Sequence, residues 1–160
     1  MRKEPEKELK RCRNYCLRLL SSRQRTEKEL KVRMRAKDYT TDHIAVTIGA
    51  LKREGLVDDL RFAVDWIDER LRKSPRARGL LEKELERKGV DAKMIDEAMS
   101  RREKQLDEKK MAVELVSGIV QDEKTPQDRD KMKARLFSFL LRRGFDAETA
   151  EEAVNEVLGY

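Results

Sequence analysis

The sequence predicts an all-α protein in which three tandem three-helix repeats, helix-turn-helix-like in character, form an elongated, curved array. The composition favours helix, because Ala, Leu, Glu, Lys and Arg dominate a chain of 160 residues with seven Gly and three Pro. One helix–turn–helix pattern occurs three times, and an amphipathic helix precedes each copy. Such small units bury their apolar faces only against neighbouring units, so we expect an extended surface in place of a deep pocket.

The recurring pattern spans residues 29–48, 80–99 and 135–154. Its first helix carries apolar pairs four residues apart on one face: Leu30/Met34, Leu81/Leu85 and Leu136/Leu140. The three turns read Lys37-Asp38-Tyr39, Lys88-Gly89-Val90 and Arg143-Gly144-Phe145. Gly89 and Gly144 suit the left-handed residue that ends a helix, whereas Asp38 makes the first copy the weakest match. The caps expected for the following helices are Thr41, Asp91 and Asp146.

The helix that precedes each pair is predicted at residues 10–20, 59–71 and 106–120. Asp58 or Asp59 is expected to be the N-cap of the second of these helices. In the third repeat, residues 121–130 make the first connection longer than its counterparts. The chain is therefore divided into a basic lead at 1–9 and three repeats at 10–57, 58–104 and 105–160.

Charge is distributed unevenly along the chain. The net charge is +6, yet residues 1–37 hold 14 Lys and Arg against 5 Asp and Glu, which gives +9. A basic amino-terminal third indicates a polyanion or an acidic protein surface as partner. A merely solvated surface is the alternative, and charge by itself does not separate the two.

A second basic cluster surrounds a predicted helix start, with Ser74 as N-cap and Pro75 in the first turn. Helix N-termini favour acidic side chains, yet five cations crowd this one: Arg70, Arg72, Lys73, Arg76 and Arg78. Alignment of the repeats places Arg25 and Lys131 opposite Arg76, so each repeat has a cation near the start of its second helix.

These helix starts are expected to bind anions through their exposed amides and arginines. The cluster around Ser74 is expected to be the main contact, supported by Arg23, Arg25, Arg33 and Arg35. In the first repeat, Thr26 and Glu29 form a predicted capping box, which leaves Arg23 and Arg25 just outside the helix. Internal ion pairs, for example with Asp65, Asp68 and Glu69, are the alternative role for the cations.

The sequence shows no arrangement of catalytic residues, so we expect neither an enzyme nor a cofactor. Asp58 and Asp59 precede an apolar helix and are interpreted as capping residues. Cys12, Cys16 and the single histidine, His43, do not complete a metal shell, so no metal is expected. Buried, reduced thiols are the interpretation of the cysteines, with a redox pair as the alternative. Without an apolar run of about 18 residues, no membrane span is expected.

Three stretches resemble the RecX family of bacterial recombination regulators. They are "RTEKEL" (25–30), "GLVDDLRFAVDWIDERL" (55–71) and "LLEKELERKGVD" (80–91). The resemblance covers about residues 12–158, and the run of Gly, two apolar residues, Asp-Asp and Phe-Ala at the repeat junction is its most specific part. Asp38 in place of glycine departs from the pattern, and the third repeat is generic.

This resemblance implies a nonenzymatic, cytoplasmic regulator that lodges in the groove of RecA filaments on single-stranded DNA. Such proteins span adjacent RecA protomers and mostly inhibit ATP hydrolysis, strand exchange and co-protease activity in recombination and the SOS response. The RecA filament is therefore the expected partner and single-stranded DNA a second one. We expect a monomer, because each repeat can cover its neighbour within the chain.

A basic helical DNA-binding regulator that acts without RecA is the alternative function. It would contact DNA nonspecifically through the basic amino-terminal third. Sequence-specific readout is disfavoured, because the second helix of each pair begins with small or acidic residues where base-reading side chains would be needed.

Overall fold

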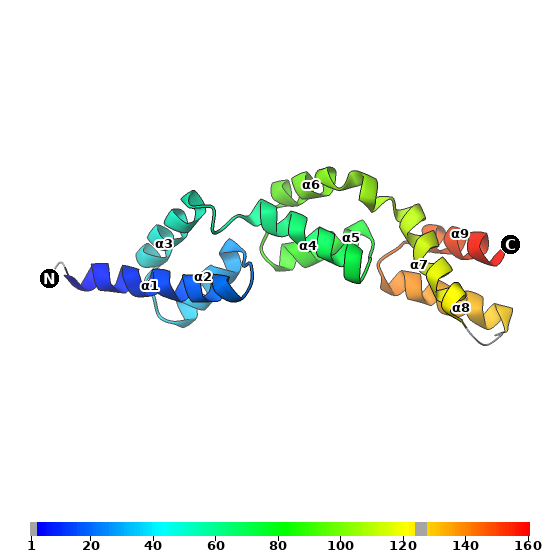
Figure 1. Ribbon diagram of the computed structural model, residues 1–160, viewed down its shortest axis with the longest axis horizontal. Helices are drawn as coiled ribbons and strands as arrows, with labels where there is room; N and C mark the ends of the chain where they lie inside the picture. The colour runs from blue at the N-terminus through cyan, green and yellow to red at the C-terminus, as the bar shows by residue number, and fades with distance from the viewer. Residues whose placement is uncertain (1–2, 124–127) are drawn as a thin grey trace. The chain divides into compact units, whose positions relative to one another are not determined.

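The computed structural model describes residues 3–123 and 128–160, and within these residues it is helical and has no strand (Figure 1). The helices are α1 (Lys3–Ser22), α2 (Glu27–Ala36), α3 (Thr41–Arg53), α4 (Asp59–Lys73), α5 (Arg78–Arg87), α6 (Ala92–Arg101), α7 (Glu108–Asp122), α8 (Arg129–Arg142) and α9 (Ala147–Leu158). A short 3-10 helix, η1 (Glu103–Leu106), precedes α7. The predicted all-α class is confirmed. Of the helices described, none combines the length and the apolar character that a membrane crossing requires.

The chain folds into two compact units. The first comprises Met1–Asp65 and Leu85–Ala98, and the second comprises Trp66–Glu84 and Met99–Tyr160. The division passes through α4, α5 and α6, so each unit joins one outer group of three helices to part of the middle group. The repeat limits inferred from the sequence stay a prediction, because this division cuts across the middle group.

In the first unit, α1, α2 and α3 pack against one another. Their core contains the buried side chains of Cys12, Cys16, Leu30, Met34, Ile44, Ile48, Leu51 and Val57. Leu30 and Met34 are fully buried, as their spacing on one helix face predicted. The apolar stripe of α2 therefore points into the unit and leaves its cations on the outer face.

The two cysteines of α1 are free thiols inside this core. Their Sγ atoms lie 3.3 Å (Cys12) and 3.2 Å (Cys16) from Sδ of Met34. Burial raises the pKa of both thiols, that of Cys16 to about 12 with a further contribution from neighbouring Cys12. Neutral, enclosed thiols are poor nucleophiles, which supports the interpretation as buried, reduced side chains.

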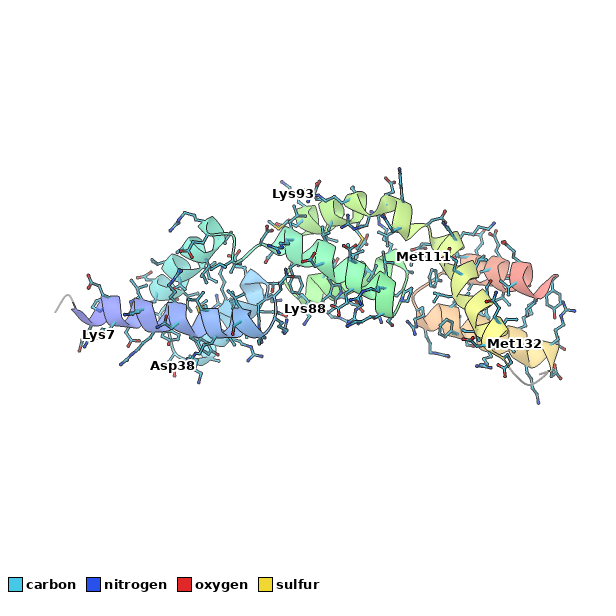
Figure 2. All side chains as sticks on the ribbon, viewed as in Figure 1. Lys7, Asp38, Lys88, Lys93, Met111 and Met132 are labelled. Carbon is cyan, nitrogen blue, oxygen red and sulfur yellow. The ribbon has the colours of Figure 1, made fainter. Side chains whose placement is uncertain are left out.

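In the second unit, α9 packs against both α7 and α8 (Figure 1). The buried side chains here include Met111 and Met132, labelled in Figure 2, together with Val116, Leu136, Leu140 and Val154. Leu136 and Leu140 are the third copy of the pair that α2 buries, and both are fully enclosed. The same pattern thus directs the same helix face inward in both units.

Most predicted helix caps are present. Thr26 and Glu29 form the capping box of α2, and Asp146 accepts a hydrogen bond from the Thr149 amide at the start of α9. Asp91 accepts one from the Lys93 amide at 2.8 Å. The prediction for Thr41 was wrong by one residue, because Thr40 is the N-cap whose hydroxyl accepts from the His43 amide.

The predicted N-cap role of Ser74 was wrong. Helix α5 begins only at Arg78, and the Ser74 amide still donates to Arg70 O at the end of α4. Pro75 therefore lies in the connection between two helices rather than in a first turn. The residue order Ser-Pro suits either position, and only the tertiary contacts of the connection distinguish them.

The turn after α5 docks on the start of α2, and the turn after α8 docks on the start of α5 in the same way. The Thr26 hydroxyl donates to the Lys88 carbonyl at 2.6 Å, and the Ala77 amide donates to the Arg143 carbonyl at 2.9 Å. Lys88 and Arg143 are the residues that the sequence alignment had placed at one repeat position. Each turn therefore covers the beginning of the preceding group's second helix.

An acidic residue from the following group completes each docked helix start. Asp58 is the N-cap of its own helix α4, because its carboxylate accepts from the Arg61 amide at 3.0 Å. Asp59, the next residue, accepts instead from the Glu27 amide of α2 at 3.0 Å. The carboxylate of Glu108, the first residue of α7, accepts from the Arg78 amide of α5 at 2.9 Å. These acids satisfy amides that a helix leaves without partners at its first turn.

Glycine is required where these turns approach the preceding helix. Gly89 has φ +86°, and a Cβ built on it would overlap the side chain of Lys28 on α2. Gly144 has φ +87°, and its Cβ would lie 2.9 Å from Leu80 Cβ. Asp38 adopts the same left-handed conformation with φ 61°, but it is exposed. Asp38 and Lys88, in the turns after α2 and α5, are labelled in Figure 2.

Gly89→Ala is expected to lower the free energy of unfolding by about 2–4 kcal/mol, because left-handed strain adds to steric overlap with α2. Gly55→Ala is the matched control, since Gly55 has φ +74° and a Cβ added there would meet nothing within 4 Å. The control is expected to lower the free energy of unfolding by only about 1 kcal/mol, from the left-handed strain alone. Urea titrations followed by circular dichroism measure both, and equal losses would contradict the docking role of Gly89.

Cys12 and Cys16 are expected to resist a thiol reagent such as DTNB in the native protein and to react at once in guanidinium. Ser100→Cys is the control, because Ser100 is exposed, and its thiol should react rapidly in the native state. Folding raises the pKa of Cys16 from 9.0 to about 12. The neutral thiol therefore adds to the free energy of unfolding in full below pH 9, and this contribution is lost as the pH rises toward 12. Native-state labelling of either cysteine at the rate of the control would contradict this burial.

Candidate functional site

A basic hollow forms in the first unit where the turn after α5 meets α2. It encloses about 210 Å³ and is lined by Arg23, Arg25, Lys28, Glu29, Val32, Arg33, Arg87 and Lys88. Residues from two distant parts of the sequence therefore face one space. The docking of Lys88 on Thr26 is the contact that brings the two parts together.

The charge of this hollow is poorly compensated. Six of its lining residues are cations and one is a carboxylate, Glu29. Glu29 already binds Lys88 at 3.1 Å and Arg23 at 3.3 Å. Across residues 3–123 and 128–160, no carboxylate lies within ion-pair distance of the other three exposed cations of the hollow, Lys28, Arg33 and Arg87. The hollow thus presents a positive potential that an anionic partner could neutralise.

The pKa values in the hollow report the same imbalance. Burial lowers the pKa of the Arg25 guanidinium, and the positive charges of Arg23 and Arg33 lower it further. Burial alone would raise the pKa of Glu29, but Lys88 and Arg23 outweigh it and hold that pKa below its ordinary value. Glu29 is therefore ionised, and the cations around it still repel one another.

Helix α1 and the capping box hold the arginines of the hollow in place. The Arg25 guanidinium donates to Leu19 O at 3.4 Å and to Ser22 Oγ at 3.3 Å, at the end of α1. Arg23 donates to Gln24 O at 3.0 Å. Because Thr26 and Glu29 already satisfy the first amides of α2, an anion would be bound by side chains rather than by the bare helix terminus.

A second basic surface lies in the second unit and is termed here the basic connection, residues 70–78. It comprises the last turn of α4, the four residues that lead to α5 and the first residue of α5. Arg70, Arg72 and Lys73 lie in the last turn of α4, where the negative end of the helix dipole favours cations. The crowding of positive charge that the sequence placed at a helix start is therefore at a helix end.

Two arginines of the basic connection are held by Glu84 of α5. The carboxylate of Glu84 forms ion pairs with Arg76 and, at 3.3 Å, with Arg70. It also accepts a hydrogen bond from Trp66 Nε1 at 2.9 Å, and Arg70 lies 4.5 Å from the Trp66 ring centroid. The Glu84 side chain is only 13% exposed, so this cluster ties α4, the connection and α5 together.

The remaining cations of the basic connection are more accessible. Arg72 is exposed, and among the described residues it has no carboxylate within ion-pair distance. Lys73 pairs with Glu69 at 2.8 Å, and Arg78 pairs with Glu82 at 3.1 Å, each one helical turn away. Exposed pairs of this kind contribute little free energy and exchange readily for a stronger partner.

The structure divides the cations that the sequence singled out. Arg23, Arg25 and Arg33 line the basic hollow, whereas Arg35 is exposed on α2 outside it. Three cations of the hollow are not among the residues that the sequence singled out: Lys28, Arg87 and Lys88. The available signal was the position of Arg87 and Lys88 beside Gly89, a glycine that permits close approach of another helix. The repeat alignment identified this turn but gave no indication that it packs against the start of α2.

Fold and surfaces together define a class: a helical protein that carries basic surfaces. Comparison with known families assigns the chain more closely. Residues 12–51 match the first three-helix domain of RecX, and residues 58–99 match the second three-helix domain of RecX. The regulatory protein RecX of Mycobacterium ulcerans is 35% identical over 151 residues, covering 94% of this chain and 86% of that protein.

Further relatives agree. The regulatory protein RecX of Mycolicibacterium smegmatis is 32% identical over 158 residues, covering 95% of this chain and 82% of that protein. The crystal structure of RecX from Lactobacillus salivarius superposes with a TM-score of 0.77 at 21% identity, covering 95% of this chain and 97% of that one. The chain belongs to the RecX family of regulatory proteins, and its tandem three-helix fold is confirmed.

Glu84→Ala is expected to destabilise the fold by about 2 kcal/mol, because it leaves a half-buried indole N–H without its acceptor and two guanidinium groups without their carboxylate partner. Glu82→Ala removes only the half-exposed pair with Arg78, one helical turn away, and is expected to cost at most about 0.5 kcal/mol. Urea titration followed by Trp66 fluorescence measures both effects and reports on the cluster directly. A loss no larger for Glu84 than for Glu82 would show that the cluster does not hold the connection.

Proposed function

We propose that this protein binds RecA filaments assembled on single-stranded DNA and restrains them, mostly inhibiting RecA ATPase, strand exchange and co-protease activity. Membership of the RecX family supports RecA as the partner. The observation that carries the proposal is the poorly compensated positive charge of the basic hollow. A filament of protein on DNA offers phosphates and acidic side chains along its length, and either would neutralise such a surface.

The contact surface in this proposal consists of the basic hollow and the accessible cations of the basic connection. Arg33 and Arg87 of the hollow have no internal carboxylate partner among the described residues, and the same holds for Arg72 of the connection. Arg70 and Arg76 are committed to Glu84 and are assigned to holding the connection. The contacts with the partner would therefore be made by cations that have no carboxylate partner among the described residues of the fold.

The DNA-dependent ATPase rate of RecA from the same organism tests the proposal. Added at substoichiometric amounts, the protein is expected to lower that rate. Arg33→Glu/Arg87→Glu is expected to raise the concentration for half-inhibition by about tenfold or more, since two attractive charges become repulsive. An unchanged rate with the wild-type protein would contradict the proposed function.

The matched control is Arg53→Glu/Arg142→Glu. Both arginines are exposed in the last turns of helices, as Arg33 and Arg87 are, and the net charge changes by the same amount. The control is expected to stay within about twofold of wild type, because it removes the same helix-dipole interactions but leaves the hollow intact. Equal loss in both variants would show that total charge, not the hollow, determines binding.

A DNA-binding regulator that acts without RecA is the second candidate. A second hollow in the first unit favours it, since its lining includes Arg11, Arg18 and Tyr39. The rings of Tyr15 and Tyr39 lie 6.3 Å apart, and Arg18 lies 5.9 Å from the Tyr15 centroid. Cations beside aromatic rings suit single-stranded DNA, for which this candidate predicts tight, steeply salt-dependent binding without RecA.

A further inference from the structure

Arg143, in the turn after α8, contacts the segment of the basic connection that joins α4 to α5. Its Nη1 donates to Ser74 Oγ at 2.6 Å and to Pro75 O at 3.2 Å. Its carbonyl accepts from the Ala77 amide at 2.9 Å. One residue of the carboxy-terminal helices therefore binds three of the four residues that join α4 to α5.

A second arginine of the connection, Arg76, binds the same serine as Arg143. Arg76 donates to Ser74 Oγ at 2.9 Å and to Ser74 O at 3.1 Å. Ser74 Oγ is thus the acceptor shared by Arg76 and Arg143. Gly144 lets the turn approach, because its Cβ position would be 2.9 Å from Leu80 Cβ and 3.5 Å from Ala77 Cβ.

The turn after α5 makes a parallel contact in the first unit. Lys88 occupies the repeat position of Arg143, and its carbonyl also receives a hydrogen bond from the preceding group. Its side chain reaches back to Glu29 of the basic hollow at 3.1 Å. In both units, a cation of a turn binds the segment that carries the accessible cations of the preceding group.

We propose that Arg143 is a positioning residue: it orders the basic connection so that Arg72, Lys73 and Arg78 present their charges to the anionic partner together. Arg143 does this without contacting the partner itself. The proposal rests on the proposed function, because it assigns a role in partner binding to the connection. An ordered connection binds with less loss of conformational entropy than a mobile one, so Arg143 would raise affinity through its neighbours.

Trypsin tests the ordering directly, since Arg72, Lys73, Arg76 and Arg78 are all cleavage sites. Arg143→Ala in the full chain is expected to accelerate the first cleavage within residues 72–78 by about tenfold, because charge-assisted hydrogen bonds that close this segment are lost. Cleavage elsewhere is expected to stay near the wild-type rate. Arg142→Ala is the matched control: it removes a neighbouring exposed arginine and one trypsin site and should behave as wild type.

Uniform acceleration at all sites would overturn the ordering role, because it would indicate loss of global stability alone. If Arg143→Ala does not fold, Ser74→Ala replaces it, since it removes only the shared hydroxyl acceptor. Either variant should also weaken inhibition of the RecA ATPase by about tenfold. Selective cleavage with full inhibition would overturn the positioning role.

A third variant, Arg72→Glu/Lys73→Glu, distinguishes an error about the positioning role of Arg143 from an error about the basic connection as a contact surface. If this charge reversal weakens inhibition and Arg143→Ala does not, the connection binds the partner but needs no positioning, and the inference about Arg143 is wrong. If neither weakens inhibition although the wild-type protein inhibits RecA, the basic connection is not a contact surface. That outcome removes the connection from the proposed function and overturns the inference with it.

Discussion

The docking of the turns after α5 and α8 on the start of an earlier helix is the constraint on which the rest of the structure depends. A turn can approach so closely only where its left-handed residue lacks a side chain, as Gly89 and Gly144 do. In each unit the approach forms a hydrogen bond between groups of helices: the Thr26 hydroxyl donates to Lys88 O in the first unit, and the Ala77 amide donates to Arg143 O in the second. It also decides where the neighbouring cations lie, so the packing constraint and the charged surfaces have one origin.

Local sequence patterns located the helices, although α1 begins at Lys3 and not at residue 10 as predicted, and they predicted the surroundings of the helices poorly. Apolar residues at helical spacing placed α4 within two residues of its observed end at Lys73, because a buried stripe is a property of the helix itself. Ser74 was misjudged, because its amide continues α4 while its hydroxyl serves Arg76 and Arg143. No local signal distinguishes a capping serine from one that accepts hydrogen bonds from a distant turn.

The sequence predicted several of the cations that contribute to the candidate site, but not which of them form ion pairs with carboxylates. The sequence locates the cations, but an accessible guanidinium and one bound to a carboxylate look alike in it. Arg72 and Arg76 lie four residues apart, yet Arg72 is exposed and Arg76 binds Glu84. The difference arises because α5 presents Glu84 toward α4, beside the indole of Trp66. Three-dimensional pairing, not charge count, therefore decides which cations can serve a partner.

Asp38 shows how the same constraint explains an apparent irregularity of the repeats. Its φ of 61° matches the left-handed conformation of the two glycines, so the turn geometry does not itself demand glycine. Aspartate tolerates this conformation better than most residues, at a modest cost. What demands glycine at positions 89 and 144 is the helix packed against each turn. Asp38 is exposed, so a side chain is tolerated there. The weakest match between the repeats therefore needs no different fold to explain it.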